Sequence, residues 1–165
     1  MGKDYLRIDD RLIHGQIVTA WCKTLGIKEI VAIDDKLAAN PTLQSIMMMG
    51  IPASYKHYVV TVEQAKAIFA ESAEGNRLFV TRMPLDLALL REELHKCDTV
   101  FIGNAAKRAD TKFNLTKGGG GVLFLSPEDV KLLDELDADG IKLVAQTVPN
   151  TSARPWAELR KAIKL

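Results

Sequence analysis

The residues best suited to chemistry lie close together at positions 7–16, just before the first predicted helix. His14 offers a nucleophilic nitrogen, and its place at a helix start favours negative charge through free amides and the helix dipole. Arg11, three residues earlier, offers a forked donor to phosphoryl oxygens. Gly15 and Gln16 add backbone amides that a ligand can approach closely. Together these are the groups that a phosphohistidine carrier requires.

Three further charged residues precede this histidine: Arg7, Asp9 and Asp10. Either carboxylate can orient the imidazole or Arg11 by hydrogen bonding. The sequence leaves open which one does so, and whether Arg7 assists His14 or only shapes the turn. A structural interpretation competes with the catalytic one. A single loop histidine is often a surface residue, and a cluster of charges is often solvated or mutually paired.

Short apolar runs alternate with segments of helical period along the whole chain, which indicates βαβ units. We therefore predict an α/β fold, an open three-layer sandwich. Its mostly parallel sheet of about seven strands has helices on both faces, in a single domain over residues 1–165. The predicted strands cover residues 5–9, 29–34, 55–60, 78–81, 99–102, 122–125 and 141–145. The predicted helices cover residues 17–25 or begin near Pro41, Thr61, Pro84, Ser126 and Pro155.

Most of the predicted helices gather their apolar residues on one face, as a helix that packs on a core does, and Trp21 belongs to that face in the helix at 17–25. Two other helices show the same pattern. The first opens with Asn40 as a cap and Pro41 at its first position. The second begins at Pro155. The expected inward residues are Leu43, Ile46 and Met47 in the first helix, and Trp156, Leu159 and Ile163 in the second.

Open parallel sheets bind ligands at the carboxyl ends of their strands, so other loops should share an edge with His14. The loops at residues 34–40, 81–84 and 103–107 meet this condition. Arg82, in the second of them, is a candidate to add positive charge beside His14 or to meet an acidic partner. A solvated surface arginine is the alternative interpretation.

Composition argues against several classes of protein. The formal net charge is +1, which gives no electrostatic case for a nucleic-acid partner or an anionic membrane. The apolar clusters are shorter than the roughly 20 residues of a membrane helix. A strand that begins by Tyr5 leaves no room for a secretory signal. Cys22 and Cys97 lack metal-ligand spacing and are expected to be reduced thiols of a cytoplasmic protein, so no metal site is predicted.

Other motifs are better explained by structural roles. The glycine-rich run at residues 117–121 precedes a strand and lacks the order GxxxxGK[ST], so we predict a turn and not a phosphate loop. His57 lies on a predicted strand without an acid beside it, and His95 lies near a helix end. Ser126 is predicted to cap a helix and not to act as a nucleophile.

The run RIDDRLIHGQIVTAW at positions 7–21 resembles the N-terminal signature of a bacterial family. That family is the mannose/fructose/sorbose-type IIB subunits of the sugar phosphotransferase system. Shorter motifs extend the resemblance over essentially the whole chain: DD at 34–35, NP at 40–41, TRMP at 81–84, GN at 103–104 and VPN at 148–150. The first motif is long and specific, whereas each of the others is weak by itself.

The resemblance implies a phosphotransferase that carries a phosphoryl group on a histidine. In that family, the histidine that matches His14 accepts the group on Nδ1 from a phosphorylated IIA partner. It then passes the group to a hexose-type sugar during uptake through membrane IIC/IID subunits. Arg11 matches the arginine that stabilises the phosphoryl group. The resemblance implies no metal or organic cofactor, and a cytoplasmic protein that associates peripherally with the transporter. The sugar and the oligomeric state remain open.

The chain also departs from the family pattern in places. Gln146 and Thr151 stand where some members have an arginine and an aspartate, and residues 117–121 are unusually rich in glycine. These differences bear on sugar preference and partner fit more than on phosphoryl chemistry. Two other functions use the same fold. A small-molecule binding module would use His14 as a polar contact in a deep pocket. A regulatory interaction protein would keep the docking surface without transferring phosphate.

Overall fold

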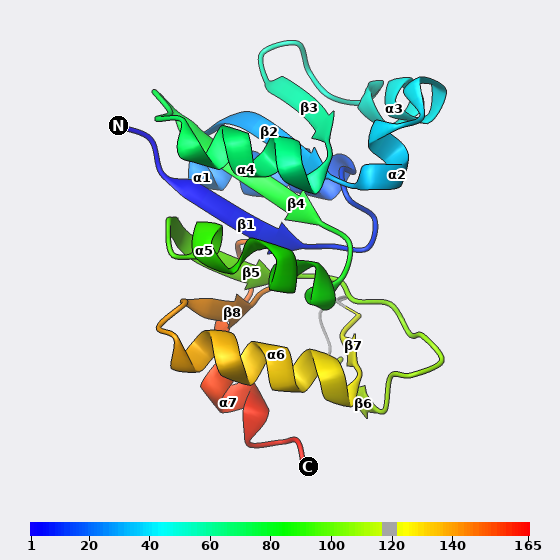
Figure 1. Ribbon diagram of the computed structural model, residues 1–165, viewed down its shortest axis with the longest axis vertical. Helices are drawn as coiled ribbons and strands as arrows, with labels where there is room; N and C mark the ends of the chain where they lie inside the picture. The colour runs from blue at the N-terminus through cyan, green and yellow to red at the C-terminus, as the bar shows by residue number, and fades with distance from the viewer. Residues whose placement is uncertain (117–121) are drawn as a thin grey trace.

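A seven-stranded sheet forms the centre of the protein in the computed structural model, which describes residues 1–116 and 122–165 (Figure 1). The strand order is β3-β2-β4-β1-β5-β8-β9, and every pairing is parallel except that of β8 with β9. The prediction of an α/β fold with a mostly parallel sheet is confirmed. The strands are β1 (Asp4–Ile8), β2 (Ile27–Ile33), β3 (Lys56–Val60), β4 (Asn76–Thr81), β5 (Cys97–Ile102), β8 (Leu143–Ala145) and β9 (Arg154–Pro155).

Helices cover both faces of this sheet, which makes three layers (Figure 1). One face packs against α4 (Val62–Ala70), the 3-10 helix η2 (Pro84–Leu90), α5 (Arg91–Leu94), α6 (Pro127–Ala138) and α7 (Trp156–Arg160). The other face packs against the π-helix η1 (Ile17–Cys22), α1 (Lys23–Leu25), α2 (Asp35–Ala38) and α3 (Pro41–Met48). None of the helices in the described parts of the chain is long and apolar enough to cross a membrane.

Strand β1 lies between β4 and β5 in the middle of the sheet, so the loop after it leaves from a well-supported position. Side chains alternate between the faces of a strand. Leu6 and Ile8 therefore point into one hydrophobic cluster, and Tyr5 points into the other. Arg7 shares the face of Tyr5, which places a charged side chain beneath the helix η1. All four residues are buried.

Two strand predictions require correction. The segment 122–125 was expected to join the main sheet, but only Phe124–Leu125 forms a strand (β7), and it pairs antiparallel with β6 (Phe113–Asn114). Strand β8 already occupies the free edge of β5, so this segment reaches the β5 side only through a bridge at Ala105. The seventh strand is instead β9, which pairs antiparallel with β8. A strand that contains proline is tolerated at a sheet edge.

The predicted inward face of α3 is also wrong. None of the residues in this helix is buried, and Leu43 and Ile46 are 49% and 60% exposed. The helix stands at a corner of the molecule, beside the edge strand β3, so little of the sheet lies beneath it (Figure 1). Met47 is only partly buried against the core. In α7 the expected stripe is buried, although the helix ends at Arg160 and Ile163 lies beyond it.

An ion pair joins three of the loops at the carboxyl edge of the sheet. Asp34 caps α2 by accepting a hydrogen bond from the Leu37 amide at 2.9 Å. Its second oxygen, Oδ2, accepts one from Arg82 Nε at 2.5 Å. Arg82 Nη1 also donates to the carbonyl of Asp10 at 2.9 Å. Arg82 therefore braces the loop after β1 against the loops after β2 and β4, as their shared edge predicts.

This brace makes a testable contribution to stability as a function of pH. Burial alone would raise the pKa of Asp34, but the Leu37 amide and Arg82 outweigh it and lower the pKa. Asp34 therefore contributes stability above its unfolded pKa of about 4, and this contribution is lost as the pH falls through the lower folded pKa. We expect Asp34→Asn to cost about 0.5–1 kcal/mol at pH 7. The difference from wild type should shrink in acid.

Urea unfolding at a series of pH values measures this effect. Asp137→Asn, which changes an exposed carboxylate on α6, is the matched control and should leave the pH dependence unchanged. A cost for Asp34→Asn that is equal at neutral and acidic pH would contradict the assignment to charge.

Candidate functional site

The loop between β1 and η1 carries the predicted site residues and is fastened to both neighbouring strands. The Asp9 amide donates to the carbonyl of Thr81 at 2.8 Å, and the Asp10 amide donates to that of Asn104 at 3.0 Å. Leu12 is fully buried with a positive φ of 55°. A residue with a side chain seldom adopts this conformation, and such positions often occur in functional loops. The loop is therefore held in one shape by its buried leucine and its neighbours.

Asp9, and not Asp10, orients the histidine. His14 Nε2 lies 3.0 Å from Asp9 Oδ2, and Asp9 is completely buried while the side chain of His14 is 17% exposed. An ionised carboxylate can only accept hydrogen bonds, so Nε2 must carry the proton. The other ring nitrogen, Nδ1, then keeps its lone pair and is the nucleophilic atom of the ring.

The charge on Asp9 is maintained by its surroundings. Burial would raise the pKa of Asp9, but the hydrogen bonds from His14 and the Arg11 amide, together with the charge of Arg7, lower it below its usual value. The Arg11 amide lies 3.1 Å from Oδ1, and the Arg11 side chain approaches the same oxygen at 3.3 Å through Nε. Asp9 therefore remains a carboxylate at neutral pH.

Arg11 is the exposed cation of the site. Its side chain is 45% exposed and is shared between Asp9 and Gln16, whose side-chain oxygen accepts from Nη2 at 3.1 Å. Each partner is held by a single side-chain hydrogen bond and nearly half of the Arg11 side chain is exposed, so the guanidinium is able to turn toward an anion near His14. Arg11 and His14 thus contact the same carboxylate, that of Asp9, and Arg11 also contacts Gln16.

The helix after His14 presents its first amides at the site. The chain turns helical at Gly15, and the Val18 amide donates to the carbonyl of His14 at 3.2 Å. The first amides of a helix have no partner within the helix, and they attract negative charge. Gly15 is exposed, and a β-carbon there would meet no atom within 4 Å. This side of the histidine is therefore open to an approaching group.

The remaining predicted residues surround this centre in different ways. Arg7 lies behind Asp9, with its Nε 3.5 Å from Oδ2. Arg82 is engaged by Asp34 and the Asp10 carbonyl, so it supports the loop backbone and its hydrogen bonds do not reach the imidazole. Burial and the neighbouring charge of Asp9 raise the pKa of Asp10. Of the two adjacent aspartates, one thus holds the ring and the other helps to fix the loop through its backbone.

Three contributors escaped prediction from the sequence. Trp21, which was expected only in the core, donates from Nε1 to the carbonyl of Thr147 at 2.9 Å. The carbonyls of Gln146 and Thr147 accept from Arg7 at 2.9 and 3.0 Å. The sequence motif that contains Trp21 predicted this helix. The backbone carbonyls that bind Arg7 lie about 140 residues away from it, and a carbonyl leaves no signal in the pattern of side chains.

The other candidates have structural surroundings. His57 contacts the carbonyl of Tyr55 through Nδ1 at 3.0 Å, and His95 is exposed at the end of α5. Ser126 caps α6 by accepting from the Asp129 amide at 3.0 Å. The glycine-rich run lies outside the described residues. Within residues 1–116 and 122–165, no three histidine, cysteine or acidic side chains lie close enough together to hold a metal ion.

Both cysteines lie in surroundings that suppress thiol reactivity. Burial raises the pKa of Cys22 and of Cys97 to about 12. Thiolates are the reactive form of cysteine, so neither thiol is a nucleophile at neutral pH.

An open groove of about 500 Å³ adjoins the site. One side of the groove belongs to the first helix, which contributes Gln16, Ala20 and Thr24. The other side is the loop at residues 148–150, which follows the carbonyls that bind Arg7. The groove therefore extends from the Arg11–Gln16 pair along the exposed flank of the helix.

Known proteins are similar to this chain over almost its full length. The family model described as "PTS system sorbose subfamily IIB component" matches residues 4–164. The sorbose-specific EIIB component of Klebsiella pneumoniae is 30% identical over 144 residues, which cover 86% of this chain and 85% of that protein. The fructose-specific EIIB component of Bacillus subtilis (strain 168) is 26% identical over 159 residues, with 95% and 94% covered.

The solved structures agree with the sequence comparisons. The crystal structure of the IIB domain of the sorbose permease from Klebsiella pneumoniae has a TM-score of 0.86 with this chain at 26% identity. The alignment covers 100% of this chain and 99% of that domain. The chain therefore belongs to the sorbose/mannose family of IIB components of the phosphotransferase system, and it is a phosphocarrier with phosphotransferase activity.

Proposed function

We propose that His14 accepts a phosphoryl group on Nδ1 from a phosphorylated IIA partner and passes it to a hexose-type sugar. The second transfer takes place during uptake through membrane IIC/IID subunits, with this chain bound peripherally at their cytoplasmic side. The observation that carries the proposal is the 3.0 Å contact between His14 Nε2 and the buried Asp9. This contact fixes the proton on Nε2 and leaves Nδ1 free to attack.

The first step is an in-line transfer between two nitrogens. The lone pair of His14 Nδ1 attacks phosphorus, and the bond from phosphorus to the donor imidazole breaks, so its electron pair returns to that nitrogen. The phosphorylated ring of His14 retains the proton on Nε2 and carries positive charge. Asp9, anionic and 3.0 Å away, stabilises that charge and keeps the ring oriented.

Arg11 and the amides at Gly15 and Gln16 act on the phosphoryl oxygens. Arg11 is the exposed arginine of the site, and its side chain can leave Gln16 for a more strongly charged acceptor. Positioning and charge stabilisation are the main contributions that a protein makes to phosphoryl transfer. In the second step, the oxygen of a sugar hydroxyl attacks phosphorus while its proton passes to water, and the electron pair of the nitrogen–phosphorus bond returns to Nδ1.

The partners and the sugar class rest on what the relatives are. The related proteins named above are specific for sorbose and fructose, which supports a hexose-type acceptor. The histidine is partly exposed, and an open groove begins at Gln16, two residues further along the chain. Such a surface suits brief contacts with other proteins, which are typically modest in area.

Phosphorylation of His14 is the direct test of this function. The protein is incubated with phosphoenolpyruvate, Enzyme I, HPr and a IIA partner, and its intact mass is measured. We expect an acid-labile gain of one phosphoryl group that is absent in His14→Ala. His95→Ala, which removes an exposed histidine elsewhere, is the control and should be labelled normally. Undiminished labelling of His14→Ala would exclude His14 as the acceptor.

Arg11→Ala tests the role of the exposed cation. Loss of a donor to the transferring oxygens should slow phosphoryl transfer by about 10²-fold or more, while urea unfolding shows an intact fold. Arg91→Ala is the matched control, because Arg91 is similarly exposed (43%) and also pairs with one carboxylate, that of Glu135. A wild-type rate in Arg11→Ala, measured by rapid-quench transfer from phosphorylated IIA, would show that another group supplies the charge.

A further inference from the structure

Arg7 is enclosed on every side although it carries a charge. Its side chain is 1% exposed. The two terminal nitrogens donate to the carbonyls of Gln146 and Thr147 at 2.9 and 3.0 Å. The guanidinium carbon also lies 5.0 Å from the centre of the Trp21 ring, in the geometry of a cation–π contact. Trp21 donates to the same Thr147 carbonyl, so helix, loop and arginine are joined at one acceptor.

Gly103 provides the space that this guanidinium occupies. A β-carbon at position 103 would lie 2.6 Å from the guanidinium carbon of Arg7 and 2.5 Å from the carbonyl oxygen of Ile8. Both distances are far shorter than a real contact, and the second atom belongs to the backbone of β1. A side chain at position 103 and the observed position of Arg7 therefore exclude each other.

The remaining nitrogen of Arg7 points to a function. Nε is buried and has no hydrogen-bond partner. It lies 3.5 Å from Asp9 Oδ2, the same oxygen that receives His14 Nε2. Burial lowers the pKa of Arg7 to about 10, so the guanidinium still carries its charge at neutral pH. A buried carboxylate is thus flanked by one immobile cation, Arg7, and one mobile cation, Arg11.

Arg7 and Arg11 differ in which of them can reach a phosphoryl group and which can stay beside Asp9. Arg11 is 45% exposed and is the one that can reach a phosphoryl group, but in turning it gives up its 3.3 Å contact with Asp9 Oδ1. A fully buried carboxylate that loses its counter-ion tends to take up a proton. A protonated Asp9 could no longer hold the proton of the ring on Nε2. Arg7 is fastened by two carbonyls and stays in place.

We propose that Arg7 is the permanent counter-ion of Asp9, a positioning residue that keeps Asp9 ionised and directed at His14 Nε2 while Arg11 moves to the phosphoryl group. The inference rests on the proposed function of His14 and adds a separate cause for its nitrogen selectivity. Arg7 itself does not touch the transferring group.

Two measurements on Arg7→Gln test this role in the full-length chain. Nitrogen-15 NMR of the imidazole, at mildly alkaline pH, reports which ring nitrogen of His14 carries the proton. Rapid-quench transfer from phosphorylated IIA reports the rate. We expect the Nε2-protonated form to lose its dominance and the rate to fall about 10–100-fold, as for other residues that orient a reacting group. Arg7→Lys keeps the charge and should restore part of both.

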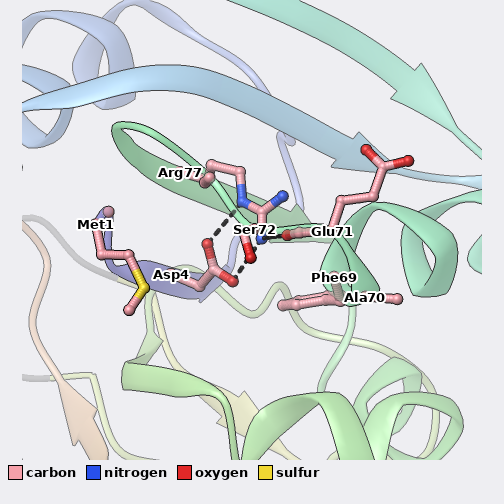
Figure 2. Close-up of a pocket in the computed structure, with 9 residues that line it drawn as sticks. Met1, Asp4, Phe69, Ala70, Glu71, Ser72 and Arg77 are labelled. Carbon is pink, nitrogen blue, oxygen red and sulfur yellow. Dashed lines mark hydrogen bonds and ion pairs between the residues drawn. The ribbon is translucent and has the colours of Figure 1, made fainter.

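Arg77 supplies a matched control near the start of β4, at the edge of the sheet opposite to the site. Like Arg7, it is a buried arginine (4% exposed), and it pairs with the carboxylate of Asp4 at 2.7 and 2.8 Å (Figure 2). It also donates to the carbonyls of Ile68 and Glu71. Arg77→Gln should lose stability in urea unfolding without changing the His14 protonation pattern or the transfer rate. An equal effect of Arg77→Gln on both readouts would reduce the role of Arg7 to general stability and overturn the inference.

Trp21→Phe keeps the experiment decisive if Arg7→Gln does not fold. It retains an aromatic ring beside Arg7 but removes the N–H that Thr147 accepts, and a smaller change in the same direction is expected. If the folded variants at Arg7 and Trp21 keep the wild-type protonation of His14 and the wild-type transfer rate, and His14 is labelled normally, the role of Arg7 is overturned while the proposed function stands. Labelling that persists in His14→Ala would instead overturn the proposed function.

Discussion

The contact between Asp9 and His14 is the interaction on which the site depends. A carboxylate withdrawn completely from water is unfavourable unless nearby groups compensate its charge. Here the compensation comes from the imidazole N–H, the Arg11 amide and the guanidinium groups of Arg7 and Arg11. Each of these groups also belongs to the site at which we propose that His14 is phosphorylated. The contacts that keep Asp9 ionised therefore also keep His14 held by one of its two ring nitrogens.

The sheet brings distant parts of the chain to one edge, where they support the loop that carries Asp9 and His14. The amides of Asp9 and Asp10 are fixed by carbonyls at the end of β4 and just after β5, and the Arg7 guanidinium is fixed by carbonyls that follow β8. Parallel strands all end at the same edge, so three separate segments can support a single short loop. The π-helix η1 completes the support by placing Trp21 over Arg7. The loop is consequently fastened at several points, whereas the Arg11 side chain is 45% exposed.

Much of this fold could be predicted because its signals are local. The caps at Asn40, Thr61 and Ser126 each accept a backbone hydrogen bond at a helix start, as their side chains indicate. The strand order and the partners of short segments are not local. The exposed face of α3 follows from its place beside the edge strand, where an apolar pattern has no sheet to cover. The strand β9 is two residues long, too short for any periodicity to reveal.

The site residues also differ in whether the sequence alone reveals their contacts. His14, Arg11 and Gln16 are neighbours in sequence, so their place in one loop can be read from the sequence, and Arg11 contacts Gln16 directly. Asp9 and Asp10 are adjacent residues of one type, and only the turn geometry decides that Asp9 faces the ring. Arg7 binds backbone carbonyls, which leave no trace in residue type. The space that Arg7 occupies depends on Gly103, whose type is visible in the sequence although its contact with Arg7 is not.

We propose that Asp9 occupies Nε2 and so directs phosphorylation to Nδ1. Nitrogen-15 NMR of the phosphorylated protein, with detection of the coupling between nitrogen and phosphorus, identifies the ring nitrogen that carries the phosphoryl group. We predict that the coupling appears at Nδ1 of His14, while Nε2 retains its proton. Coupling at Nε2, or phosphorylation at another residue while His14 remains unmodified, would contradict the account.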